Sequence, residues 1–223
     1  ISFGTPVVFE SASTSWTSAT FDTSYNRVVV AYADAGNSSH GTVNMGSISG
    51  SVITFGGTAT VFEAANTQYI SATYDSNLEK VVIAYKDTGN SNYGTAIVGT
   101  ATGSYTMTFG TAAVFAAADT DYSVATFDSG SNKVFIAFRD EDNSSYGTAI
   151  VGTVSGTSIS FGTEVVFEAA TTQYIGCAYD SNENKVAIVY SDNGNSDYGT
   201  GVVFSVGGTN LTSTNFVGIA DAA

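Results

Sequence analysis

The sequence predicts an all-β protein, a four-bladed β-propeller whose blades are four-stranded antiparallel sheets. The main observation is an internal repeat, because the chain writes one motif four times at intervals of 52 to 54 residues. Each copy contains short runs rich in Val, Ile, Thr, Tyr and Phe, bounded by Ser, Asn, Asp and Gly, and no segment shows a helical apolar period. A fixed period of this length indicates one supersecondary unit used repeatedly. The register is marked by Asp34, Asp87, Asp140 and Asp192, and by Phe3, Phe55, Phe109 and Phe161.

Each copy is expected to form four strands in up-and-down order. In the second copy these strands cover 69–75, 80–87, 93–101 and 106–115. The first two are joined by Ser-Asn-Leu-Glu at 76–79, and the next two by Thr-Gly-Asn-Ser-Asn at 88–92. Such residues favour tight turns, since Gly and Asn tolerate positive φ. Four hairpin-linked strands make one antiparallel sheet, and Pro6, the single proline, suits a sheet edge.

These sheets need covering on both faces. In the strand at 80–87, Val81, Ile83 and Tyr85 point to one side, and Val82 and Ala84 point to the other. Blades stacked around an axis bury both faces, as in a propeller. A linear solenoid would also bury them, but its end repeats should carry polar caps, and the first and fourth copies show none. The propeller is therefore the favoured architecture.

The two ends of the chain suggest how the ring closes. Residues 1–10, ISFGTPVVFE, copy the fourth strand before any first strand has occurred, and the fourth copy lacks such a segment after 198–206. We therefore expect residues 1–10 to close the ring as the outer strand of the last blade. Alternatively, 210–219 completes that blade and 1–10 pair elsewhere, for example with a neighbouring subunit. The predicted single domain, 1–223, consists of the strand 1–10, repeats at 11–63, 64–116, 117–168 and 169–209, and a tail at 210–223.

Composition excludes several classes of partner. Six Lys and Arg residues face 20 Asp and Glu residues, which gives a net charge of −14. Nucleic acid and anionic lipid both require clustered basic side chains, so neither is an expected partner. No apolar run is long enough to span a membrane, and membrane insertion is not expected. The lone Cys177 forms no intrachain disulfide, and we expect it to be a small buried residue.

One face of the propeller collects the candidate ligand-binding residues. The connection into each first strand and the turn after each second strand share this face. Aromatic rings beside Asp and Asn side chains can bind sugars, because a pyranose offers both an apolar face and hydroxyl groups. Alternatively, each Asp makes an Asx turn and each aromatic fills the gap between blades. The candidates are Trp16, Tyr69, Tyr122 and Tyr174, with Asp34, Asp87, Asp140, Asp192, Asn37, Asn90, Asn143 and Asn195.

Other polar residues offer weaker candidates. Asp140, Glu141 and Asp142 adjoin one another and form the one weak candidate for Ca²⁺, although their spacing matches no EF-hand loop and solvated loop acids are favoured. No other cofactor is expected. His40 stands where the other copies have tyrosine and has no triad partner, so it is interpreted as a variant loop residue. The aspartates of the opposite face, which we expect to cap turns, are Asp22, Asp75, Asp128 and Asp180.

The repeat also resembles known propeller arrays. Residues 152–170, GTVSGTSISFGTEVVFEAA, resemble a degenerate Asp-box hairpin of sialidase-like propellers, with Ser155, Thr157 and Phe161 at its Ser, Asp and Trp positions and without the defining Asp. The whole repeat resembles those of phage tail fibres and related virion surface proteins. The terminal NFVGIADAA, 215–223, is similar to the segment that follows such arrays. This resemblance implies a location on a virion or an extracellular surface.

These observations favour a non-enzymatic module that serves host adhesion through glycan binding, or structural decoration, with a surface glycan or other virion proteins as its partner. The alternative is a divergent glycoside-active enzyme of sialidase-like architecture. Sialidase chemistry itself requires three arginines around the substrate carboxylate. This chain has two, and they cannot share a pocket, because Arg27 aligns with the start of the second strand of each copy and Arg139 with its end. Catalytic residues usually break a repeat, and the acidic residues here mostly obey it.

Overall fold

The computed structural model describes residues 1–103, 105–205 and the backbone of 217–218. Within these residues the fold is all-β, with two short 3-10 turns, η1 (Ala35–Asn37) and η2 (Asn193–Asn195), and no α-helix. None of the helical segments in this part of the chain is long and apolar enough to cross a membrane. The strands are β1 (Thr14–Asp22), β2 (Arg27–Asp34), β3 (His40–Ser49), β4 (Val52–Asp75), β5 (Lys80–Asp87), β6 (Tyr93–Ala101), β7 (Met107–Phe109), β8 (Ala113–Asp128), β9 (Lys133–Asp140), β10 (Tyr146–Ser155), β11 (Ser158–Phe161), β12 (Val165–Asp180), β13 (Lys185–Asp192), β14 (Tyr198–Phe204) and β15 (Val217–Gly218).

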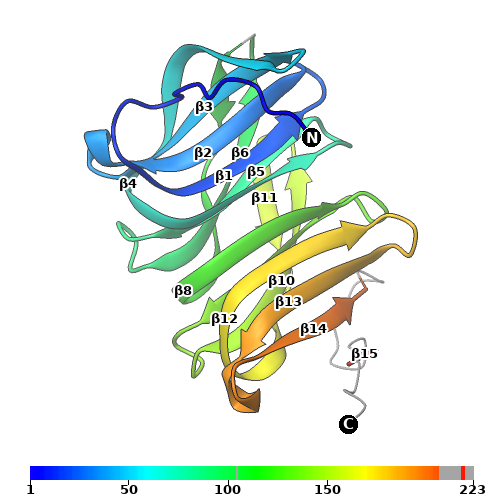
Figure 1. Cartoon of the computed structure of the whole chain (residues 1–223). Helices are drawn as coiled ribbons and strands as arrows, with labels where there is room; N and C mark the ends of the chain where they lie inside the picture. The colour runs from blue at the N-terminus through cyan, green and yellow to red at the C-terminus, as the bar shows by residue number, and fades with distance from the viewer. Residues whose placement is uncertain (104, 206–216, 219–223) are drawn as a thin grey trace.

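The strands form four successive antiparallel sheets, which we call blades one to four (Figure 1). Blade one contains β1, β2, β3 and the first part of β4, and blade two contains the second part of β4, then β5, β6, β7 and the first part of β8. Blade three continues with the rest of β8, β9, β10, β11 and the start of β12. Blade four holds the rest of β12 with β13, β14 and β15. The predicted all-β, antiparallel fold is confirmed, and its arrangement is propeller-like.

The first hairpin of every blade is fixed by an aspartate cap. The Oδ1 atom of Asp75, for example, accepts hydrogen bonds from the backbone N–H groups of Asn77 and Leu78 at 2.9 and 3.0 Å. Asp22, Asp128 and Asp180 accept the same pair of bonds in their own turns. A side chain that satisfies turn N–H groups favours the turn over an extended chain. The prediction that these aspartates cap turns is confirmed.

Stability resides mainly in apolar cores between neighbouring blades. Val82 and Ala84 on one side of β5 pack with Ile136 and Phe138 of blade three. Ile83 and the other side of β5 pack against blade one. A third cluster joins blades three and four. The two-sided apolar pattern of the second strands is thus explained, since each inner sheet is buried on both faces.

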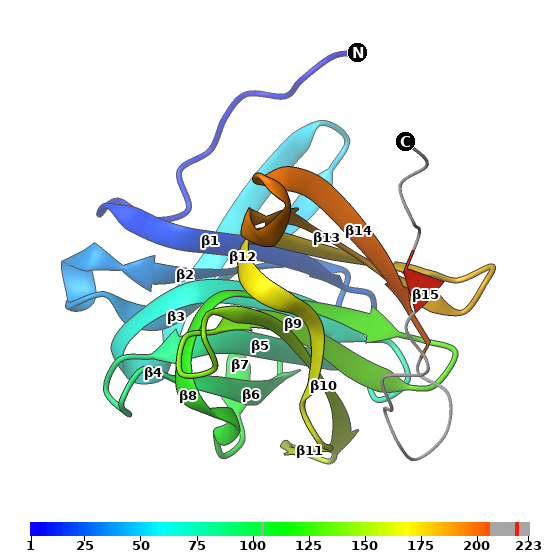
Figure 2. The same ribbon diagram turned by 90° about the horizontal axis from the view of Figure 1, so that it is seen from below.

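Within the described residues the blades do not close into a ring, and the predicted closure by residues 1–10 is wrong for this structure. Residues 1–13 belong to no strand, and the side chain of Phe3 is 90% exposed. The physical reason is that the end of this segment is held by blade one, where Asn44 Nδ2 donates to the Phe9 carbonyl at 2.8 Å. Figure 2 shows the chain before β1 as a trace that joins none of the sheets.

The edge of blade four is occupied in part by the other end of the chain. Val217 pairs with Val203, and Gly218 with Val202. This pairing agrees with the alternative that the segment 210–219 completes the last blade. The remainder of that segment, 210–216 and 219, lies outside the described residues.

A hydroxyl–carboxylate bond links successive blades and follows the repeat. Glu63, at the end of the fourth strand of blade one, accepts a hydrogen bond at 3.0 Å from the Tyr85 hydroxyl of blade two. Glu168 and Tyr190 repeat this contact at 2.9 Å, and Glu10 and Tyr32 repeat it at 3.0 Å. Blade three instead has Phe138, and Ala116 stands at the position of the glutamate. Hydroxyl and carboxylate are therefore either both present or both absent.

We expect Glu63→Ala to lower the free energy of unfolding by about 1–3 kcal/mol, because it leaves the fully buried Tyr85 hydroxyl without an acceptor. The double variant Glu63→Ala/Tyr85→Phe reproduces the pair found in blade three and should cost less than the sum of the two single variants. Urea denaturation of all four members of the cycle measures this coupling. Additive losses would contradict the pairing.

Candidate functional site

The first strands of successive blades lie side by side, on the inner side of the series of blades. Ser18 Oγ on β1 accepts a hydrogen bond from Ala72 N on β4 at 3.0 Å. Ser71 Oγ in turn accepts one from Ala125 N on β8 at 2.9 Å. These bonds join strands of different blades, so equivalent side chains on the first strands come into contact.

Each first strand carries a bulge, and each bulge holds an aromatic residue at positive φ. The register slips between Gln68 and Ser71 on β4, and between Asp121 and Val124 on β8, with the same slip in blades one and four. Bulky side chains rarely adopt this backbone conformation, which costs about 1–3 kcal/mol per residue and is typical of functional positions. The residues are Trp16, Tyr69, Tyr122 and Tyr174, with φ of 53°, 49°, 52° and 52°.

These four aromatic side chains form one continuous row, here called the aromatic row. Adjacent ring centroids are separated by 4.3, 5.3 and 5.4 Å along the order in which the blades follow one another. Tyr69 and Tyr122 are half-buried in the middle, whereas Trp16 is 41% and Tyr174 72% exposed at the two ends. The structure therefore brings the predicted aromatics together as a single row rather than as four separate sites.

The predicted loops lie at the same end of the blades as the aromatic row. Thr14, two residues before Trp16, pairs with Asp34, and the other blades repeat this register. Asp34 Oδ1 accepts from Gly36 N at 2.8 Å, and Asp87 Oδ1 from Gly89 N at 2.9 Å. These carboxylates hold their own turns, which is the role that the alternative interpretation gives them.

The loops of blades three and four complete the set. Asp140 Oδ1 accepts from the backbone N–H groups of Asp142 and Asn143, both at 3.1 Å, whereas Asp192 makes no such bond as the cap of its turn. The amides at the loop tips are exposed in all four blades, so their side chains reach solvent beside the row. They are Asn37, Asn90, Asn143 and Asn195.

A cluster of charged side chains lies beside the middle of the row, and the sequence analysis missed it. Lys86 Nζ binds Asp121 Oδ1 at 2.8 Å and also contacts the Asp119 carboxylate. Arg139 Nη2 binds Asp121 Oδ2 at 2.7 Å and also contacts Glu141. The side chains of Lys86, Arg139 and Asp121 are only 10–14% exposed. We call these five residues the charged cluster.

Burial and neighbouring charges shift the pKa values of residues in the charged cluster. Burial alone would raise the pKa of Asp121, but the hydrogen bond and charge of Lys86, with those of Arg139, hold it below its usual range. Burial opposes protonation of Lys86, yet its bonds to Asp119 and Asp121 raise its pKa. Burial and the nearby Asp121 carboxylate raise the pKa of Tyr69 to about 12. Asp121 and Lys86 are therefore charged at neutral pH, whereas Tyr69 is not.

The charged cluster also contacts the row directly. The Arg139 guanidinium carbon lies 4.8 Å from the centroid of the Tyr122 ring, and Lys86 Nζ lies 5.9 Å from that of Tyr69. Cations at such distances are attracted by the face of an aromatic ring. The middle of the row is thus polar and charged, while its two ends are exposed rings.

The charged cluster breaks the repeat, and this was the signal available in the sequence. At the position of Asp121 the other copies have Ser15, Gln68 and Gln173. At the position of Lys86 and Arg139, the outer copies have Ala33 and Ser191. The prediction followed the aspartates that recur in every copy. A comparison of the four copies at every position would instead have identified the positions at which the middle copies differ.

The weak Ca²⁺ candidate does not assemble. Asp140 faces its own turn, Glu141 contacts Arg139 and accepts from Ser145 Oγ at 2.7 Å, and Asp142 accepts from Asp119 N at 3.3 Å. The three carboxylates therefore have different partners. Across the described part of the chain, no group of three or more His, Cys, Asp or Glu side chains has an arrangement that could hold a metal ion. Cys177 is half-buried, and burial raises its thiol pKa to about 12.

No protein-family model and no curated protein matches the chain. Among solved structures, the chain is similar to an exo-β-1,3-galactanase from Phanerochaete chrysosporium crystallised with β-1,3-galactotriose. The TM-score is 0.53 at 8% identity, and the match covers 88% of this chain and 48% of the galactanase. The chain thus spans about half the length of that enzyme. At this identity the likeness shows the fold alone, which is a propeller-like arrangement of antiparallel sheets.

Proposed function

We propose that the chain is a carbohydrate-binding module and that the aromatic row is its binding surface. The observation that carries this proposal is the pair of exposed rings, Trp16 and Tyr174, held in a costly backbone conformation at the two ends of one row. Exposed rings offer an apolar platform that complements the C–H face of a pyranose. The regular spacing of the four rings in the row suits an extended saccharide that spans several blades.

Polar groups around the row would supply hydrogen bonds to sugar hydroxyls. The exposed loop amides lie along its length, and the charged cluster adds fixed donors and acceptors at its centre. We place the module on a virion or an extracellular surface, in a propeller completed to a closed ring, with a surface glycan as its partner.

Glycoside hydrolysis is the second candidate, and the fold likeness to a galactanase favours it. Asp121 and Glu141 both contact the same nitrogen of Arg139. Two oxygens bound to one nitrogen lie within about 6 Å, twice a hydrogen-bond length, and carboxyl groups about 5–5.5 Å apart serve retaining glycosidases. Such an enzyme pairs an ionised carboxylate with a carboxyl group that donates a proton. The lowered pKa of Asp121 suits the ionised member, but every carboxyl group of the charged cluster contacts Lys86 or Arg139, which leaves none without a cation partner to act as the proton donor. Binding without hydrolysis is therefore the preferred function.

A glycan array followed by calorimetric titration tests both candidates. We expect binding to one class of oligosaccharide, weakened at least tenfold by Tyr174→Gly or Trp16→Gly, which is about 1.4 kcal/mol for each residue. Glycine accepts positive φ, so these variants should leave the melting temperature unchanged or raise it. Tyr25→Ala is the matched control, because this tyrosine is also 41% exposed but lies in the opposite hairpin.

The outcomes separate the two candidates. Release of reducing sugar from β-1,3-galactan or another polysaccharide, abolished by Asp121→Asn, would establish the enzyme instead. If neither binding nor hydrolysis occurs, and Tyr174→Gly destabilises the chain, the row serves only to fill the inner side of the series of blades.

A further inference from the structure

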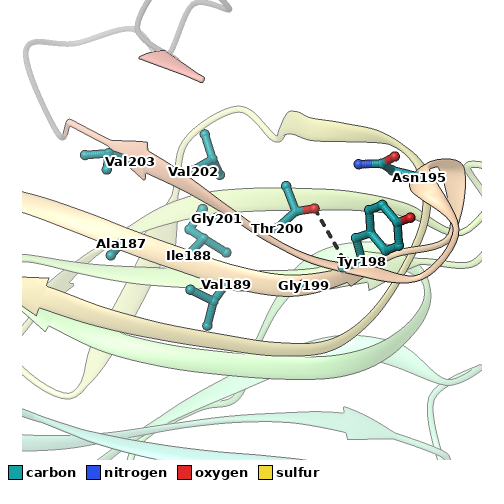
Figure 3. Close-up of a pocket in the computed structure, with 10 residues that line it drawn as sticks. All are labelled: Ala187, Ile188, Val189, Asn195, Tyr198, Gly199, Thr200, Gly201, Val202 and Val203. Carbon is teal, nitrogen blue, oxygen red and sulfur yellow. Dashed lines mark hydrogen bonds between the residues drawn. The ribbon is translucent and has the colours of Figure 1, made fainter. Parts of the chain in front are cut away.

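Blade four presents to solvent the face that the other blades bury. Ala31, Ala84 and Ala137 are fully buried against the next blade, whereas Val189, at the same position of the repeat, is 56% exposed. Figure 3 shows Val189 on β13 and the neighbouring residues of β14 lining a hollow of about 470 Å³. Among the described residues, nothing covers this apolar face of the fourth blade.

The adjoining strand, β14, contains a glycine that no described aromatic ring covers. We call a glycine position that can hold such a ring a seat. In blades one, two and three, the glycine that follows the first residue of the third strand lies beneath a phenylalanine ring. A Cβ atom added to Gly41, Gly94 or Gly147 would lie 2.4–2.5 Å from Phe62, Phe115 or Phe167. The equivalent Gly199 on β14 has no described atom within 4 Å of that position.

Among the described phenylalanines at this position of the repeat, Phe9 is the one that covers no glycine. Phe62 packs between Gly41 of blade one and Tyr85 of blade two. The ring centroids of Phe62 and Tyr85 are 5.3 Å apart. Phe9 makes the equivalent contact with Tyr32, at 5.2 Å, but lies on no glycine seat of its own chain. Residues before it are exposed and unpaired, including Val8 at 75%. Phe9 therefore has the repeat position of the phenylalanines that cover a glycine, and Gly199 has the repeat position of the glycines that are covered.

We infer that residues 7–10 of a second copy of this chain dock on blade four, beside the part of its edge, Val202 and Val203, that β15 already occupies. Phe9 of the second copy would occupy the seat at Gly199, and its blade one would cover Val189. Val114 pairs with Thr95, and Val166 with Thr148, so Val8 of the donor would pair with Thr200. The contact is heterologous, since each copy donates at one end and accepts at the other. A second copy is the occupant because Phe9 and Glu10 are already fixed to blade one of their own chain.

Sedimentation velocity of the chain across a range of concentrations tests this inference. We expect concentration-dependent association, weakened at least tenfold by Val8→Lys on the donor side or by Gly199→Val on the acceptor side. Neither substitution removes a contact within one chain, since Val8 is exposed and the seat at Gly199 is open. An equimolar mixture of the two variants should form a one-to-one dimer, because each retains the half that the other has lost.

Leu78→Lys is the control, as Leu78 is 38% exposed in the first hairpin of blade two. It should leave association unchanged, and all three variants should melt within a few degrees of the parent chain. A monomer at every concentration would overturn the inference. Association that persists in both variants, or a mixture that fails to pair, would also overturn it by locating the contact elsewhere.

Discussion

Lys86→Ala should lower the free energy of unfolding by about 3 kcal/mol, the lower end of the range for breaking a buried ion pair. Lys86 contacts both Asp119 and Asp121, and its side chain is 10% exposed. Its removal leaves Asp119 without this cation and Asp121 with Arg139 alone. The penalty arises mainly at Asp121, whose side chain is 14% exposed, since the Asp119 side chain is 34% exposed and keeps part of its hydration.

The pH dependence identifies the origin of this loss. The pKa of Asp121 is lowered in the folded state, so its stabilisation is present above the unfolded value of about 3.9 and disappears as the pH falls through the lowered value. The pKa of Lys86 is raised, so its part is present below about 10.4 and is lost as the pH rises further. The difference between parent and variant should therefore be greatest near pH 7 and shrink below pH 4.

Urea denaturation at pH 7 and pH 3 measures the effect. Lys133→Ala is the control, because Lys133 donates to Thr153 Oγ1 in an exposed contact and should change stability by less than about 0.5 kcal/mol. An equal loss at both pH values for Lys86→Ala would mean that the packing of its aliphatic stem, rather than its charge, is responsible.

Strand content and blade order could be predicted because they depend on local chemistry that recurs. Asp75 caps its hairpin through bonds to Asn77 and Leu78, all within four residues, and the same sequence produces the same turn in each copy. The alternation of Val81, Val82 and Ile83 likewise specifies two buried faces without reference to distant parts of the chain. The prediction of one face for the aromatic residues follows from the same periodicity.

Ring closure could not be predicted, because residues 1–10 carry the same pattern as every fourth strand. That pattern indicates a strand that pairs with a third strand, but it does not say which one. The structure decides through Phe9 and Glu10, which are bound to blade one while the rest of the segment is unpaired. Closure depends on the relative position of the first and last blades, which no short segment encodes.

The charged cluster, and the contact of the four predicted aromatic rings in a single row, escaped prediction for two different reasons. Lys86 and Asp121 are 35 residues apart and belong to different blades, so only the packing of blade two against blade three brings them together. The row depends on bulges that place tyrosine at positive φ, a conformation that propensity argues against for a bulky residue. At such strained positions, sequence rules are expected to fail.

Phe135→Ala should cost about 3–5 kcal/mol, which is typical of removing a buried aromatic ring. Phe135 is fully buried between blades three and four, and its ring centroid lies 4.9 Å from that of Phe204. Both rings belong to the core that joins the last two blades, so the cavity cannot be filled without moving a sheet. Chemical denaturation should show a large loss of stability with a single cooperative transition.

Val189→Ala is the matched control, because Val189 lies on the corresponding face of blade four and is largely exposed. In dilute solution it should change the free energy of unfolding by less than about 0.5 kcal/mol. If it instead destabilises the dilute chain by as much as an interior residue, then blade four is covered within the same molecule and the ring is closed. The contrast between Phe135 and Val189 therefore measures how many interfaces between blades one chain completes by itself.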